Sequence, residues 1–201
     1  MHQLIDSIRV GDSAALPSAG DAWLICALAE RDAAAAQNAL IAMGDTPLRD
    51  GTVQFSRPFI EGIIARLTKD EGKARFAFTA ARSEQEKIIQ AQPDYGPPLC
   101  VLGLIDAALG RKEDALREGR RAIELLPATK DALNGQRMIK YLAMIAAWVG
   151  DKDLAYEELA IAIHRAGFLS YGELKLLSFW DPLRGDPRFK KIVASLAPKE
   201  N

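Results

Sequence analysis

Small residues recur at matching positions along this chain, and their spacing constrains the fold more than any other feature. In the segment "GLIDAALGRKEDALREGRRAIELLP", Gly110 opens a charged turn, and alanines follow five and twelve positions later. The corresponding residues of a second copy, 40 residues further on, are Gly150, Ala155 and Ala162. An upstream copy, shifted by 41 residues, has small or apolar residues at equivalent places, namely Gly62, Ala74, Phe78 and Ala81. A period of this length is typical of helical-repeat proteins.

Each copy predicts two helices joined by a tight turn. Between Glu113 and Leu126, apolar or small residues recur at i, i+3, i+4 and i+7, the pattern of a helix with one buried face, and Pro127 ends that helix. The preceding segment, Leu99 to Leu109, carries only Asp106 as a charge, which predicts a helix covered on two sides. Small residues let two helix axes approach closely, and a larger side chain there would overpack the contact by about 1–3 kcal/mol.

These patterns predict an all-α fold that forms a single domain over residues 1–201. The predicted architecture is an α-solenoid of about four antiparallel helix pairs closed by a C-terminal capping helix. The predicted pairs span residues 20–43, 57–92, 96–127 and 135–167, and the predicted cap spans 170–197. The register of the first pair is ambiguous. The segment "GTVQF" alternates briefly between apolar and polar residues but has no partner strand, so we expect no sheet.

The C-terminal segment predicts how the array ends. Asp186 is suited to be an N-cap and Pro187 to be the first helical residue. The apolar face of the helix that follows would consist of Phe189, Ile192, Val193 and Leu196. A terminal repeat has to cover its open side, and we expect this helix to do so, with Trp180 and Leu183 anchoring the turn before it.

Composition excludes several kinds of partner. The formal net charge is -1 and cationic residues alternate with anionic ones, which gives no reason to expect nucleic acid. No run approaches the roughly 20 apolar residues of a spanning helix, so we expect no membrane segment. The first residues also lack the pattern of a secretory signal. Cys26 and Cys100 lie far apart and neither has a CxxC neighbour or a nearby histidine, which indicates two reduced thiols in a cytoplasmic protein and no metal site.

Catalysis has little support in the sequence. Only two histidines occur, His2 near the start and His164 at the end of a predicted helix. Paired carboxylates lie in turns or on a polar helix face, and no phosphate-binding, nucleophile-elbow or zinc-protease motif is present. We therefore expect a non-catalytic protein without a cofactor.

The third predicted pair resembles a tetratricopeptide repeat (TPR). The matching residues are Leu99, Leu102, Gly103, Gly110, Ala115, Ala122 and Pro127. The fourth pair matches through Ile139, Leu142, Ala143, Gly150, Ala155, Leu159 and Ala162, with Gly167 in place of the final proline. Two positions depart from the pattern, since Asp106 replaces the usual tyrosine and Gly119 the usual aromatic residue. The step of 40 or 41 residues also exceeds the standard 34.

The ending "FWDPLRGDPRFKKIVASL" is similar to the close of C-terminal TPR modules in bacterial signalling proteins of the kinase, nucleotide cyclase or winged-helix type. The resemblance implies a regulatory or scaffolding module of a longer protein, whose concave groove holds a peptide or a partner helix. The groove residues that it implies are Arg137, Lys140, Tyr141, Met144 and Trp148. An acidic or apolar protein partner would suit these side chains.

Three alternatives stay open. Tyr141, Met144 and Trp148 could instead pack beneath the C-terminal cap as ordinary core residues. The concave side could sense a small molecule or short peptide, or it could serve self-association as a homodimer. Sequence reasoning alone does not choose between them.

Overall fold

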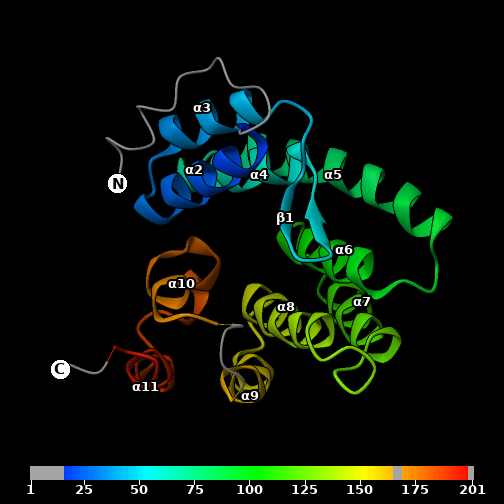
Figure 1. Cartoon of the computed structure of the whole chain (residues 1–201), viewed down its shortest axis with the longest axis vertical. Helices are drawn as coiled ribbons and strands as arrows, with labels where there is room; N and C mark the ends of the chain where they lie inside the picture. The colour runs from blue at the N-terminus through cyan, green and yellow to red at the C-terminus, as the bar shows by residue number, and fades with distance from the viewer. Residues whose placement is uncertain (1–15, 165–168, 199–201) are drawn as a thin grey trace.

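The computed structural model describes residues 16–164 and 169–198, and over these residues the chain is mostly helical (Figure 1). Helices pair in chain order into four antiparallel hairpins. Their bounds are α2 Leu16–Glu30 with α3 Ala33–Met43, α4 Arg57–Leu67 with α5 Glu71–Ala91, α6 Gly96–Ala108 with α7 Lys112–Leu125, and α8 Asn134–Trp148 with α9 Lys152–Ile163. The predicted helical character is confirmed over the described residues, whereas Gly167, at the end of the fourth predicted pair, lies outside them.

One turn geometry joins the two helices of every hairpin. A residue with a positive φ follows each first helix by one or two positions, and these four residues are Arg31, Lys69, Gly110 and Gly150. The next residue donates its N–H to the carbonyl five positions earlier, at 2.8–2.9 Å in all four turns. This hydrogen bond closes a Schellman motif, which satisfies the free carbonyls of the first helix. The same residue is then the N-cap of the second helix, and where it is aspartate its side chain accepts a backbone N–H.

This common turn gives all four hairpins one register. Five residues after the positive-φ position, each hairpin has a buried alanine, and these are Ala36, Ala74, Ala115 and Ala155. The ambiguity in the first pair is thereby resolved, with Leu24 equivalent to Gly62, Gly103 and Ala143.

Close packing requires the small residues: a Cβ on Gly103 would lie 2.7 Å from Ile145 Cδ1 and 2.9 Å from the Ala115 carbonyl oxygen.

A short β-hairpin lies between the first two helix hairpins, and here the prediction that "GTVQF" has no partner is wrong. Strand β1 (Leu48–Asp50) pairs antiparallel with β2 (Val53–Phe55), with Asp50 opposite Val53. Gly51 supplies the positive φ of the turn, and an Asp-Gly pair flanked by alternating residues is a known hairpin signal. The β-hairpin extends towards α6 and α8 (Figure 1).

The C-terminal segment returns to the start of the array. Helix α10 (Tyr171–Leu176) contacts α2, and it is followed by the 3-10 helix η1 (Ser178–Leu183) and by α11 (Pro187–Ser195). Asp186 accepts the N–H of Arg188 and Pro187 begins α11, as predicted. Phe189 is buried and α11 packs against α9, while Trp180 and Leu183 are fully buried in η1. In Figure 1 the hairpins therefore follow a curve, and α10 lies in its opening.

Among the described helices, none is both long enough and apolar enough to cross a bilayer.

Candidate functional site

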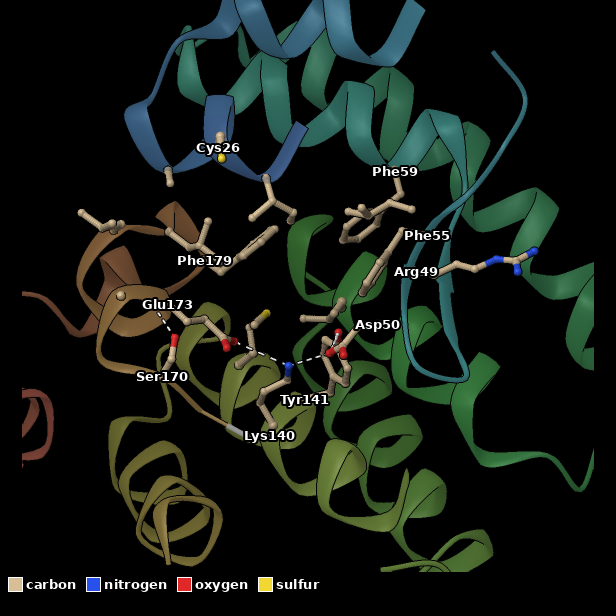
Figure 2. Close-up of a pocket in the computed structure, with 18 residues that line it drawn as sticks. Cys26, Arg49, Asp50, Phe55, Phe59, Lys140, Tyr141, Ser170, Glu173 and Phe179 are labelled. Atoms are coloured by element: carbon tan, nitrogen blue, oxygen red, sulfur yellow. Dashed lines mark hydrogen bonds and ion pairs between the residues drawn. The ribbon is translucent and has the colours of Figure 1, made fainter. Parts of the chain in front are cut away.

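A cavity of about 500 Å³ lies inside the curve and is lined by segments from both ends of the chain. Its wall combines α2, the β-hairpin, α4, α6, α8 and the C-terminal segment from Ser170 to Phe179. Figure 2 shows Cys26 and Phe59 on one side, Phe55 and Asp50 on the β-hairpin side, and Phe179 and Glu173 opposite them. The volume is within the range of pockets that hold small ligands.

Most of the cavity wall is apolar. The apolar lining side chains are Ile25, Ala29, Leu48, Phe55, Phe59, Leu104, Met144, Leu176, Leu177 and Phe179. Phe55 stacks on Phe59 with ring centroids 4.8 Å apart, and it meets Tyr141 edge-on at 5.7 Å. A flat or elongated apolar molecule would therefore find aromatic surface along one side of the cavity.

A cluster of charged residues forms the polar floor of this cavity. Asp50 Oδ1 accepts from Arg137 Nε at 3.0 Å, and Asp50 Oδ2 accepts from Lys140 Nζ at 2.6 Å and from the Tyr141 hydroxyl at 2.8 Å. Glu173 on α10 lies 3.5 Å from Lys140 Nζ on the other side. In Figure 2 the Lys140 ammonium lies between the two carboxylates. We call Asp50, Arg137, Lys140, Tyr141 and Glu173 the Asp50 cluster.

The two carboxylates of the Asp50 cluster differ electrostatically. Burial alone would raise the pKa of Asp50, but the charge of Lys140 and the hydrogen bonds from Lys140, Arg137 and Tyr141 lower it to about 2. Burial raises the pKa of Glu173, Lys140 opposes this rise, and the negative charge of Asp50 adds to it. Asp50 is thus a fixed anion, whereas Glu173 is the carboxylate that gives up its charge more readily.

Tyr141 is buried in the same cluster. Burial and then the nearby Asp50 charge raise the pKa of Tyr141 well above its usual range. The phenol therefore keeps its proton and acts as a permanent hydrogen-bond donor to Asp50.

The five residues predicted to form a groove are divided among three environments. Lys140, Tyr141 and Met144 line the central cavity. Arg137 holds the β-hairpin through Asp50, and a Cβ on Gly51 would lie only 2.5 Å from its guanidinium carbon. Trp148 lines a second, smaller pocket of about 310 Å³. Its Nε1 donates to the carbonyl of Phe179 at 2.8 Å, and its ring lies beneath Arg66.

The chain itself therefore covers much of the predicted groove. The β-hairpin lies over the start of α8, where Thr52 Oγ1 is 3.0 Å from Asn134 Oδ1, and η1 lies over its end. The cationic side chains that would suit an acidic partner already have Asp50 as their partner. The central cavity is the part of the predicted groove that neither the β-hairpin nor η1 covers.

No family model, curated protein or solved structure matches this chain. The site is consequently interpreted from its own geometry.

Sequence reasoning missed two members of the Asp50 cluster. The sequence alone assigns Asp50 no role, although the Asp50–Gly51 pair between alternating residues is a usable hairpin signal. Glu173 carries no comparable signal, because its role depends on α10 returning to the cavity. Cys26 also lines the cavity, whereas Cys100 is buried, donates to the Pro97 carbonyl at 3.0 Å, and has a thiol pKa that burial raises.

In residues 16–164 and 169–198, no three His, Cys, Asp or Glu side chains are grouped so as to hold a metal ion. His164 is exposed at the end of α9, while His2 lies outside the described residues. The arrangement combines an apolar chamber with a few fixed charges at one end, which is the usual composition of a small-molecule site.

Proposed function

We propose that this chain is a non-catalytic binding module, a TPR-like α-solenoid that folds around a central cavity and holds a small, mainly apolar molecule there. The single observation that carries the proposal is the cavity of about 500 Å³, with apolar walls and the Asp50 cluster at its floor. Because the cavity wall joins α2 to α10, occupancy would link the two ends of the array. Such a link would suit a regulatory module that reports the presence of a ligand.

The repeat register supports the TPR-like part of the proposal. Four hairpins share one turn geometry, with positive-φ residues at positions 31, 69, 110 and 150. A buried alanine follows each turn by five residues. The first helices α6 and α8 also pack on each other, as neighbouring first helices do when hairpins stack into a solenoid.

The β-hairpin favours a small ligand over a peptide. A peptide lying along α8 would have to displace Asp50 from Lys140 and Arg137, and each of these hydrogen bonds joins charged groups, worth roughly 1.5–3 kcal/mol. A small molecule can enter the cavity and leave those contacts intact. Apolar walls also provide the main driving force for such a ligand, about 25 cal/mol per Å² of apolar surface buried.

A thermal-shift screen of small apolar compounds tests this function. A ligand at one hundred times its Kd stabilises the folded state by about 2.7 kcal/mol. For a chain of this size, that corresponds to a rise in melting temperature of about 5–10 °C. Ala29 lines the cavity from α2 and is half-buried, so Ala29→Trp would fill part of the space. The matched control is Ala42→Trp on the exposed face of α3.

We expect at least one compound to raise the melting temperature of the wild type and of Ala42→Trp, with a much smaller effect on Ala29→Trp. Compounds that stabilise all three proteins equally would bind elsewhere, and that result would reject the cavity as the site. A screen without any stabilising compound would count against the function itself.

Peptide binding in the groove is the second candidate, and the clustering of Arg137 and Lys140 favours it. If Asp50 occupies a position meant for an acidic partner, Asp50→Ala should capture acidic peptides that the wild type does not. Fluorescence anisotropy with a labelled acidic peptide measures this directly. Equal, weak binding to both proteins would remove this candidate.

A further inference from the structure

We infer that the molecule held in the cavity is a compact apolar carboxylic acid, whose carboxylate binds Lys140 Nζ in the position that Glu173 now occupies. This inference rests on the proposed function, because it names the class of ligand for the same cavity. Its basis is the long ion pair between Lys140 and Glu173, the three hydrogen bonds that Asp50 already accepts, and the position of Lys140 at the floor of an apolar cavity.

Lys140 is a buried ammonium with unused binding capacity. The residue is 6% exposed. An ammonium has three N–H donors, and Lys140 has one short contact, at 2.6 Å to Asp50, one long ion pair, at 3.5 Å to Glu173, and a position 5.0 Å from the centroid of the Tyr141 ring. A buried charge without full hydrogen bonding is costly, so an additional acceptor supplied from the cavity would be stabilising.

Asp50 offers a cationic ligand at most one further acceptor position, because three of the roughly four lone-pair sites of its carboxylate are already used. Both of its oxygens already accept hydrogen bonds, one from Arg137 and the other from Lys140 and Tyr141. An amine entering the cavity would also lie close to the Lys140 charge. The Asp50 cluster therefore selects against a cation at this end of the cavity.

The charges of the Asp50 cluster leave room for one exchangeable anion. Arg137 and Lys140 both pair with the carboxylate of Asp50, Glu173 is the second carboxylate beside Lys140, and Asp131 adds a negative charge near Arg137. Arg49 lines the cavity but points away from it in Figure 2. A ligand carboxylate that replaces Glu173 would leave the net charge unchanged. It would also be able to approach Lys140 Nζ more closely than Glu173 does at 3.5 Å.

Glu173 is suited to being displaced. It lies on α10, a helix of six residues, and its backbone N–H is capped by Ser170 Oγ at 3.0 Å. Its side chain is 21% exposed, so it has a route towards solvent. Burial raises the pKa of Glu173. If a ligand binds Lys140 in its place, Glu173 can therefore become protonated at a lower free-energy cost than an ordinary carboxylate.

The apolar part of the ligand would lie above the floor. Phe55, Phe59 and Phe179 present aromatic surface there, and Met144 supplies an adaptable side chain. A molecule with an acidic group at one end and an aromatic or aliphatic body fits this distribution. A polyanion would not, because Lys140 is the only cation of the Asp50 cluster that lines the cavity.

Three probes with one skeleton test the inference by isothermal titration calorimetry at pH 7: 4-phenylbutyrate, 4-phenylbutanol and 4-phenylbutylamine. We expect the carboxylate to bind at least about ten-fold more tightly than the alcohol, a difference of about 1.4 kcal/mol, and the amine to bind most weakly. Lys140→Met should abolish the preference for the carboxylate while leaving alcohol binding. Glu173→Gln, which removes the competing carboxylate and keeps the shape, should strengthen carboxylate binding several-fold and leave the alcohol unchanged.

Each result separates the ligand class from the proposed function. Equal binding of carboxylate and alcohol, both weakened by Ala29→Trp, would retain the cavity as a binding site and overturn the carboxylate inference. Tightest binding of the amine would overturn it as well, and so would a failure of all three probes. If Lys140→Met does not fold, the result for Glu173→Gln tests the inference. An unchanged carboxylate affinity in this conservative variant would show that the ligand does not replace Glu173 at Lys140.

Discussion

Replacing Asp50 by asparagine keeps the shape of the side chain and removes the charge to which Lys140 and Arg137 donate. These donors belong to α8, whereas Asp50 belongs to the β-hairpin nearly ninety residues earlier. The substitution therefore tests whether the charge of Asp50 holds the β-hairpin over the cavity. We expect Asp50→Asn to destabilise the protein at neutral pH.

The magnitude follows from the pKa of Asp50, which falls from 3.8 to about 2 in the folded state. At about 1.36 kcal/mol per pKa unit, this shift is worth about 2 kcal/mol once some solvent screening is allowed for a side chain that is 31% exposed. Because the pKa is lowered on folding, this stabilisation is fully present above pH 3.8 and is lost as the pH falls towards about 2.

Urea unfolding at a series of pH values from 7 to 2.5 measures this effect. The difference in unfolding free energy between the wild type and Asp50→Asn should be about 2 kcal/mol at pH 7 and should decrease steadily below pH 4. Asp45→Asn, an exposed change in the same connecting segment, is the control and should stay within about 0.5 kcal/mol of the wild type. A difference that is absent at pH 7, or that is constant over the whole pH range, would refute the electrostatic reasoning.

Three further predictions concern the helix hairpins, all measured by chemical unfolding. Lys69→Gly should stabilise the protein by about 0.5–1 kcal/mol, because Lys69 is exposed at a φ of 58°, whereas Gly110→Ala should cost about 1 kcal/mol through the same backbone strain; changes of the same sign would contradict this. Gly103→Ala should cost about 1–3 kcal/mol by overpacking, while Gly72→Ala, whose new Cβ would meet only Asp70 at 3.6 Å, should be neutral or stabilising. Arg82→Met should cost about 1–3 kcal/mol, because it leaves Asp106, 1% exposed, with only the longer 3.8 Å contact to Arg111. Adding Asp106→Leu should recover most of that loss, and a strictly additive double variant would count against the buried pair.

The hairpins were predictable from the sequence because the forces that form them act locally. Helical periodicity depends on residues three and four positions apart, and Gly110 and Gly150 mark turns that favour glycine for its positive φ. The capping helix was predictable for the same reason, since Asp186 and Pro187 act on the turn that they begin.

The turn of the first hairpin could not be predicted from local sequence signals alone. Its turn has the same geometry as the others, yet Arg31 holds the positive φ, so the glycine signal is missing. The Arg31 guanidinium instead pairs with Asp181, at distances of 2.8 and 2.5 Å, in the distant 3-10 helix η1. Only the tertiary structure reveals that a contact 150 positions away accompanies this strained turn.

By itself, the sequence determined a run of helix hairpins, their turns and the helix that ends them, because each is set by neighbours within a few residues along the chain. The tertiary structure alone decided that Asp50 and Glu173 meet Lys140, and that α10 contacts α2 across a cavity. Such meetings depend on the summed curvature of four hairpins and on the path of the segment after α9. Burial and charge pairing become defined only once these distant surfaces face each other.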